Sequence, residues 1–189
     1  ATYEIIVVSQ NKFLVELSKL AEQHSNVIIC FQEDSLTISA LRNFGANQST
    51  GEYLAFLDAD VSLSANWLSA MLSTISEQPN CVLASAAQAN SKDAPPLEKI
   101  RTALSNADLD CNVSFLPGRN LFLSREIFEK VNGFPEHLIT CEDYYFTDKR
   151  IKKWGESRQY YESEKIKHLK QSIEFVREIK IYNIRVYLN

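Results

Sequence analysis

The feature that most constrains the fold is a regular alternation of short apolar runs with segments of helical period. The apolar runs cover residues 3–8, 26–31, 53–57 and 81–88, and the segments between them, 12–24, 34–50 and 64–78, repeat apolar residues every three or four positions. Strands buried on both faces and joined by helices form parallel sheets with right-handed crossovers. The sequence therefore predicts an α/β fold, with a doubly wound, mostly parallel sheet that carries helices on both faces.

The pattern changes after residue 90. A loop over 90–96 precedes a predicted helix at 96–107, and residues 111–134 indicate strand, turn, strand and a short helix that ends at Gly133. A further helix opens with Glu142 and Asp143, and the tail has amphipathic helical spacing. We expect one domain over residues 1–168, with a nucleotide-binding part at about 1–88 and an acceptor-side part at about 89–168. An amphipathic helical tail is expected at 169–189.

Composition excludes several classes of protein. The net charge of −4 gives no basis for broad nucleic-acid binding. The four cysteines are scattered without a CxxC pair, which argues against a zinc site and against a disulfide framework and favours buried thiols in a reducing compartment. No apolar run reaches the roughly 20 residues of a membrane span. We expect a cytoplasmic protein, and the basic tail leaves open a peripheral contact with the inner face of a membrane.

Two carboxylates, Asp58 and Asp60, directly follow the apolar run at 53–57. In an open parallel sheet, ligands bind beyond the carboxyl ends of the strands. Two such acids can hold Mg²⁺ or Mn²⁺, which prefer oxygen ligands and complete their shell with substrate phosphates. Taken alone, the pair also fits an acidic turn after a strand.

The neighbouring segments make the pattern more specific. The stretches "LRNFG" (41–45), "TGEYLAFLDAD" (50–60) and "GRNLFLSREIFEKVNGF" with "CEDYYFTDKRIKKWG" (118–155) occur in order along the chain. They resemble the motifs of family 2 glycosyltransferases, which use nucleotide-sugar donors and have the GT-A fold. The resemblance runs from about residue 3 to residue 168.

On the donor side, the resemblance implies a role for each of four residues. Arg42 would contact the nucleotide, and Asp58 would lie near the ribose or diphosphate. Asp60 would ligate Mn²⁺ or Mg²⁺, and His168 would be a further metal ligand. A cation and an arginine would neutralise the diphosphate as it leaves.

On the acceptor side, the resemblance implies that Asp143 is the general base of an inverting transfer to an acceptor hydroxyl. Glu142 would orient the acceptor or its loop, and Gly118 and Asn120 would contact the substrate. A turn in "LPGRN" is the alternative for Gly118 and Asn120. The implied function is a sugar transfer in polysaccharide or glycoconjugate synthesis, with an unidentified glycan or lipid-linked acceptor.

The chain departs from the family pattern at its beginning. Residues 3–8 resemble the second strand of the family, so we expect the family's first strand and helix to be missing and the sheet to be N-terminally incomplete, without one interior strand. Ser9 and Gln10 stand where the family has acids that read the nucleobase. An inactive, nucleotide-sugar-binding module is therefore the alternative. A phospho-acceptor receiver domain ranks lower, because residues 7–10 supply no acidic pair.

Overall fold

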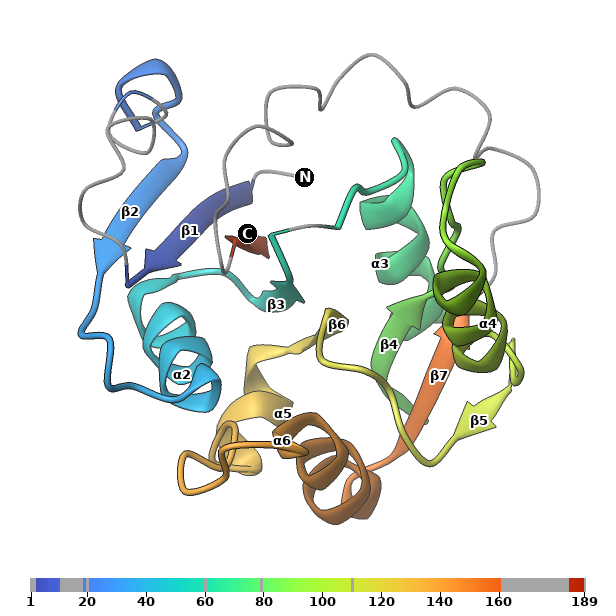
Figure 1. Ribbon diagram of the computed structural model, residues 1–189. Helices are drawn as coiled ribbons and strands as arrows, with labels where there is room; N and C mark the ends of the chain where they lie inside the picture. The colour runs from blue at the N-terminus through green and yellow to red at the C-terminus, as the bar shows by residue number, and fades with distance from the viewer. Residues whose placement is uncertain are drawn as a thin grey trace.

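The computed structural model describes residues 3–10, 19, 21–59, 61–78, 80–109, 111–160 and 184–188. Within this part of the chain, eight strands form one sheet in the order β2-β1-β8-β3-β6-β4-β7-β5. Figure 1 shows the sheet with its helices. The strands are β1 (Tyr3–Ser9), β2 (Val27–Phe31), β3 (Tyr53–Leu57), β4 (Cys81–Ala86), β5 (Asn112–Val113), β6 (Asn120–Ser124), β7 (Glu156–Tyr160) and β8 (Ile184–Leu188).

The sheet is mixed, which corrects the expectation of a mostly parallel one. Strands β1 and β2 pair in parallel, as do β4 and β7, but β8, β6 and β5 run antiparallel to every neighbour they pair with. The reason is clearest at β6. No helix lies between β5 and β6, so the chain enters the sheet at the carboxyl end of β3, where Asn120 lies opposite Leu57, and runs back along that strand.

Strand β8 lies in the interior of the sheet. Its backbone pairs antiparallel with β1 on one side and with β3 on the other. The described sheet is therefore continuous, and the predicted gap left by an absent interior strand is not seen. The predicted helical tail is also wrong for residues 184–188, because these residues are extended. The rest of the tail lies outside the described residues.

Helices cover both faces of the sheet, as the sequence predicted. Leu54 and Phe56 of β3 face one core cluster, and the alternate residues Ala55 and Leu57 face a second one. The first cluster contains side chains of α2, α5 and the segment after α6, whereas the second contains side chains of α3. The helices are α2 (Ile38–Gln48), α3 (Trp67–Glu77), α4 (Pro96–Ser105), α5 (Arg125–Lys130) and α6 (Glu142–Tyr144).

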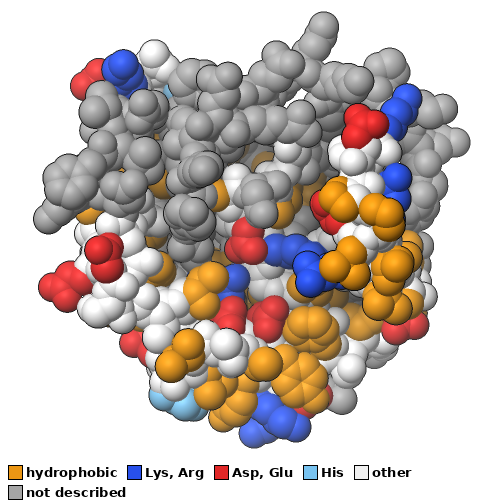
Figure 2. Space-filling view, in the orientation of Figure 1, with side chains coloured by type: hydrophobic (Ala, Val, Ile, Leu, Met, Phe, Trp, Pro, Cys, Tyr) orange, Lys and Arg blue, Asp and Glu red, His pale blue; other side chains and the backbone are white. Residues whose placement is uncertain are grey.

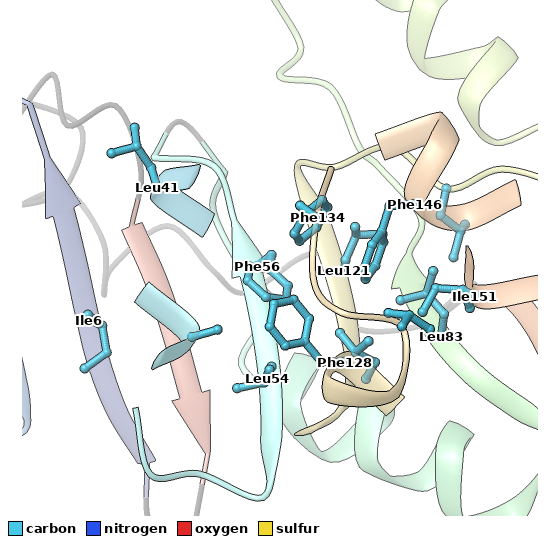
Figure 3. Close-up of a cluster of buried hydrophobic side chains, with 14 of the residues drawn as sticks. Ile6, Leu41, Leu54, Phe56, Leu83, Leu121, Phe128, Phe134, Phe146 and Ile151 are labelled. Carbon is cyan, nitrogen blue, oxygen red and sulfur yellow. The ribbon is translucent and has the colours of Figure 1, made fainter. Parts of the chain in front are cut away.

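Aromatic rings fill the first core cluster next to the end of β3 (Figure 3). Phe134 stacks on Phe146 with ring centroids 4.0 Å apart and packs edge-on against Phe56 at 5.0 Å. Phe128 of α5 also packs against Phe56, with ring centroids 5.4 Å apart. Such pairs add about 0.5–1.5 kcal/mol beyond their buried area. They hold the segment after Gly133 and the segment after α6 against β3.

Several boundaries differ from the sequence predictions. Helix α2 begins at Ile38, where the Thr37 side chain accepts a hydrogen bond from Ala40 N, rather than at a cap at residue 34 or 35. The helix predicted from Glu142 becomes a π-helix at Tyr145–Arg150 and a short 3₁₀ turn at Ile151–Lys153. No helix in the described part has the length and apolarity that crossing a membrane requires.

All four cysteines are described and are free thiols. The prediction that they are buried holds for Cys81, whereas Cys30 is half-buried and Cys111 and Cys141 are exposed.

Candidate active site

Asp58 lies directly after the last residue of β3, at the edge where ligands bind in α/β sheets. Its backbone N–H donates a 3.0 Å hydrogen bond to the carbonyl of Arg119, and its own carbonyl accepts from Val61 N at 3.1 Å. The side chain keeps 36% of its surface exposed. The backbone of Asp58 is therefore held in place, while its carboxylate remains accessible to a ligand.

Arg42 projects from α2 toward Asp58 and is nearly inaccessible to solvent, with 3% of its side chain exposed. Its Nη2 atom lies 3.5 Å from Asp58 Oδ1 and donates to the Gly118 carbonyl at 3.2 Å. Its Nη1 atom donates to Glu142 Oε1 at 2.8 Å. The guanidinium also lies over the Phe134 ring, 5.0 Å from its centroid. A buried charge is stable only when it is paired in this way.

Gly118 lies in the loop before β6 and packs directly on this guanidinium. A Cβ atom built at Gly118 would lie 2.7 Å from Arg42 Nη2 and 2.8 Å from Nη1. These distances are shorter than real Cβ contacts, so a side chain here would displace Arg42. The close approach of the two residues therefore requires a glycine.

Glu142 and Asp143 form the start of α6, and both are half-buried. Cys141, just before them, has φ of 58°, in the left-handed region, which turns the chain into the helix. Asp143 Oδ2 accepts a 2.9 Å hydrogen bond from Gly118 N, and Oδ1 accepts from Tyr144 N at 2.8 Å. The carboxylate is thus held by two backbone donors.

Asn120 is the first residue of β6 and is 6% exposed. Its Oδ1 atom is buried, and within the described residues it has no hydrogen-bond partner. A buried amide without a partner is costly, so it is a candidate for contact with a substrate hydroxyl.

The structure thus brings together five of the residues that the sequence singled out, from four separate segments. They are Arg42, Asp58, Gly118, Glu142 and Asp143. Near the middle of the face in Figure 2, acidic and basic side chains meet beside hydrophobic ones. Asp60 and His168 lie outside the described residues.

Two further residues of the site were not singled out by the sequence. Arg119 holds Asp58 through its carbonyl, and its Nη2 donates to Ser105 Oγ of α4 at 2.8 Å. Phe134 supports the guanidinium of Arg42. The available signals were the position of Arg119 between Gly118 and Asn120, and an aromatic residue directly after Gly133.

Within the described residues, no three side chains of His, Cys, Asp or Glu lie together in a group that could hold a metal ion. Asp58 offers one exposed carboxylate at the strand end. A single hard oxygen ligand suits Mg²⁺ or Mn²⁺ when the donor's phosphates and water supply the remaining ligands.

Comparison with solved structures gives the fold. The chain is similar to the mannosyltransferase PcManGT from Pyrobaculum calidifontis, solved in complex with GDP-Man and Mn²⁺, with a TM-score of 0.59 and 18% identity. It is similar to TarS 1–349 of S. aureus with a TM-score of 0.62 and 18% identity. The matches cover 87% and 86% of this chain and 49% of each of those chains. The fold is therefore α/β of the GT-A type, as predicted.

Comparison of sequences gives the family. The glycosyltransferase AglE of Haloferax volcanii is 28% identical over 151 residues, which are 77% of this chain and 50% of that protein. This chain therefore spans half the length of that relative. The sequence pattern of Glycosyl transferase family 2 matches residues 1–132, the region that contains Arg42, Asp58 and the Gly118 loop. With that match covering most of its length, the chain belongs to glycosyl transferase family 2.

Proposed function

We propose that the protein transfers a sugar from a nucleotide-sugar donor to an acceptor hydroxyl, with inversion and with the help of a divalent cation. The observation that carries this proposal is the meeting of Asp58, at the end of β3, with Glu142 and Asp143, at the start of α6, around one buried arginine. Direct transfer requires the residues that bind the sugar donor and the general base to lie in one site.

On the donor side, Asp58 and Asp60 would hold Mn²⁺ or Mg²⁺ together with the donor diphosphate. When bound, the cation would offset the negative charge that the diphosphate gains as it leaves. The similar structure of PcManGT was solved with GDP-Man and Mn²⁺, which supports this choice of ligands. His168 stays a predicted further ligand.

On the acceptor side, Asp143 would accept the proton of the attacking hydroxyl. The two backbone hydrogen bonds from Gly118 and Tyr144 hold its carboxylate in one orientation. General bases typically contribute 10²–10⁴-fold to rate. Attack from the face opposite the diphosphate inverts the anomeric carbon, and Glu142 would keep the start of α6 against Arg42.

Asn120 would bind a hydroxyl of the transferred sugar. Its buried Oδ1 lacks a partner within the described residues, and the residue lies opposite Leu57, one position before Asp58. A site built to pair a hydroxyl discriminates strongly against sugars that lack it.

The acceptor would be a glycan or a lipid-linked molecule in polysaccharide or glycoconjugate synthesis. The proposed cellular location is the cytoplasm, with a membrane contact through the tail left open.

Binding and turnover of a donor panel test the proposal. GDP-mannose, UDP-glucose and UDP-N-acetylglucosamine would each be titrated with and without Mn²⁺ and then followed for release of nucleoside diphosphate. We expect one donor to bind in a cation-dependent way and to turn over. Binding without turnover would instead support the nucleotide-sugar-binding module.

Substitutions then assign the roles. Asp143→Asn is expected to lower kcat by about 10²–10⁴ while the donor still binds, and Asp60→Ala to abolish the Mn²⁺ dependence of donor binding. Asp93→Asn, an exposed acid outside the site, is the control. If Asp60→Ala and Asp143→Ala both leave transfer unchanged, the mechanism is wrong.

A further inference from the structure

Arg42 links the donor side of the site to the acceptor side. We infer that it is a positioning residue that couples donor binding to the placement of Asp143, and not a group that contacts the nucleotide, as the sequence resemblance implied. The inference rests on the proposed function, because it takes Asp58 as a residue that binds the sugar donor and Asp143 as the general base.

The burial of Arg42 is the first argument. Only 3% of the side chain is exposed, and one face of the guanidinium is covered by the Phe134 ring at 5.0 Å. A group enclosed in this way has no free surface to present to a nucleotide. It can influence the reaction only through the residues that it holds.

The partners of Arg42 are the second argument, because they come from three different segments. Asp58 follows β3, Gly118 lies in the loop before β6, and Glu142 opens α6. A guanidinium has five N–H donors in a rigid planar fork and can serve several acceptors at once. A lysine has one compact ammonium group and could not hold the three segments in the same way.

The backbone of Gly118 is the third argument, because it connects Arg42 to the proposed base. Its carbonyl accepts from Arg42 Nη2 at 3.2 Å, while its N–H donates to Asp143 Oδ2 at 2.9 Å. The two contacts are made by the peptide groups on either side of the Gly118 Cα atom, so one residue carries both. A shift of Arg42 therefore disturbs the backbone of Gly118, and with it the hydrogen bond that orients Asp143.

The coupling follows from the charges. One guanidinium is shared between Asp58 at 3.5 Å and Glu142 at 2.8 Å. If Glu142 loses its charge, Arg42 is left with Asp58 as its ionic partner, and Asp58 becomes less available to the donor. A change on the acceptor side thereby weakens donor binding, although Glu142 itself need not touch the donor.

A double-mutant cycle tests this coupling in the whole protein. Calorimetry would measure, in the presence of Mn²⁺, the affinity for the nucleotide sugar of the panel that the wild type binds. We expect Glu142→Gln to weaken binding by about fivefold or more, the scale of ordinary coupling between sites. In an Arg42→Lys background, Glu142→Gln should weaken it no further, and additive effects would overturn the inference.

Arg125 supplies the matched control. It is a half-buried arginine that bonds to the carbonyls of Ala46, Ser49 and Gly51 at the end of α2 and lies outside the site. Arg125→Lys removes a similar set of hydrogen bonds. We expect Glu142→Gln to have the same effect in the Arg125→Lys background as in the wild type.

A second readout separates this inference from the proposed function. Hydrogen exchange at the Gly118 amide reports the hydrogen bond to Asp143 in the absence of any nucleotide sugar. Arg42→Lys should speed that exchange by about tenfold as the backbone of Gly118 loosens, and Arg125→Lys should leave it unchanged. If no nucleotide sugar binds but Gly118 exchange quickens, the proposed function and the coupling to donor binding fail, whereas the hold of Arg42 on Gly118 and Asp143 stands. Unchanged exchange in Arg42→Lys overturns the positioning role whatever the donor result.

Discussion

The backbone N–H of Gly118 donates a 2.9 Å hydrogen bond to Oδ2 of Asp143, across 25 residues of sequence. The same glycine lies too close to Arg42 to accept a side chain. The relationship ties the loop before β6 to the start of α6 and fixes a carboxylate at the carboxyl end of β3. Its consequences can be measured at Gly118 itself.

Gly118→Ala should lower the activity of the folded protein in addition to its stability. The added methyl group would lie 2.7 Å from Arg42 Nη2, so either the guanidinium or the loop must move. A misplacement of about 1 Å at a site can cost about 10²-fold in rate, whereas overpacking typically costs about 1–3 kcal/mol in stability. Steady-state kinetics and urea unfolding of the same preparation would separate the two effects.

Gly155→Ala is the control for that experiment. Its Cβ would lie 2.6 Å from Asn80 O and 2.6 Å from Val82 Cγ1, a clash of the same size at the edge of β4, away from Arg42. We expect a comparable loss of stability and a normal kcat for the folded protein. Equal losses of kcat in both variants would contradict a specific role for Gly118.

The strands of the first half could be predicted from sequence because a strand buried on both faces needs an unbroken apolar run. Residues 53–57 show this: Leu54 and Phe56 face one core cluster, Ala55 and Leu57 face the other, and β3 has the predicted bounds. The antiparallel entry of β6 could not be predicted in this way. Its direction depends on where the preceding loop lies, which is a property of the tertiary structure.

The residues of the site were predicted by their motifs, but the environment of Arg42 was not. The sequence places Arg42 on a helix, and most arginines on helices are exposed. Its burial follows from Phe134 and Glu142, which lie about ninety and one hundred residues further along the chain. Local periodicity contains no information on such distant partners.

Cys30 should react more slowly with iodoacetamide than Cys111 and Cys141. Burial raises the pKa of the Cys30 thiol, so less thiolate is present at neutral pH. Its reactivity should therefore keep rising at a pH where ordinary thiols have levelled off. Mass spectrometry after timed alkylation between about pH 7 and pH 10 would measure each site, and a faster rate at Cys30 than at Cys111 would contradict the prediction.

Leu121→Ala should destabilise the protein, whereas Leu104→Ala should not. Leu121 lies on β6 with none of its surface exposed, so its truncation leaves a cavity that costs about 2–5 kcal/mol. Leu104 lies on α4 with 71% of its surface exposed, and alanine there should change the free energy of unfolding by less than about 0.5 kcal/mol. Denaturant unfolding of the two variants provides the comparison, and a large effect at Leu104 would show that α4 is covered in solution.

Val186→Pro tests the interior position of β8. The backbone of Val186 lies opposite Ile5 of β1 and Ala55 of β3, so the strand has neighbours on both sides. Proline removes a backbone N–H and is confined to edge strands and bulges, because in an interior strand it leaves an acceptor without its donor. We expect a loss of about 1–3 kcal/mol in the free energy of unfolding, the cost of one buried unpaired group. Val186→Thr keeps the N–H and the β-branched shape, so it should cost less stability than the proline. Equal stability of the proline and threonine variants in urea unfolding would show that β8 does not pair with β1 and β3 in solution.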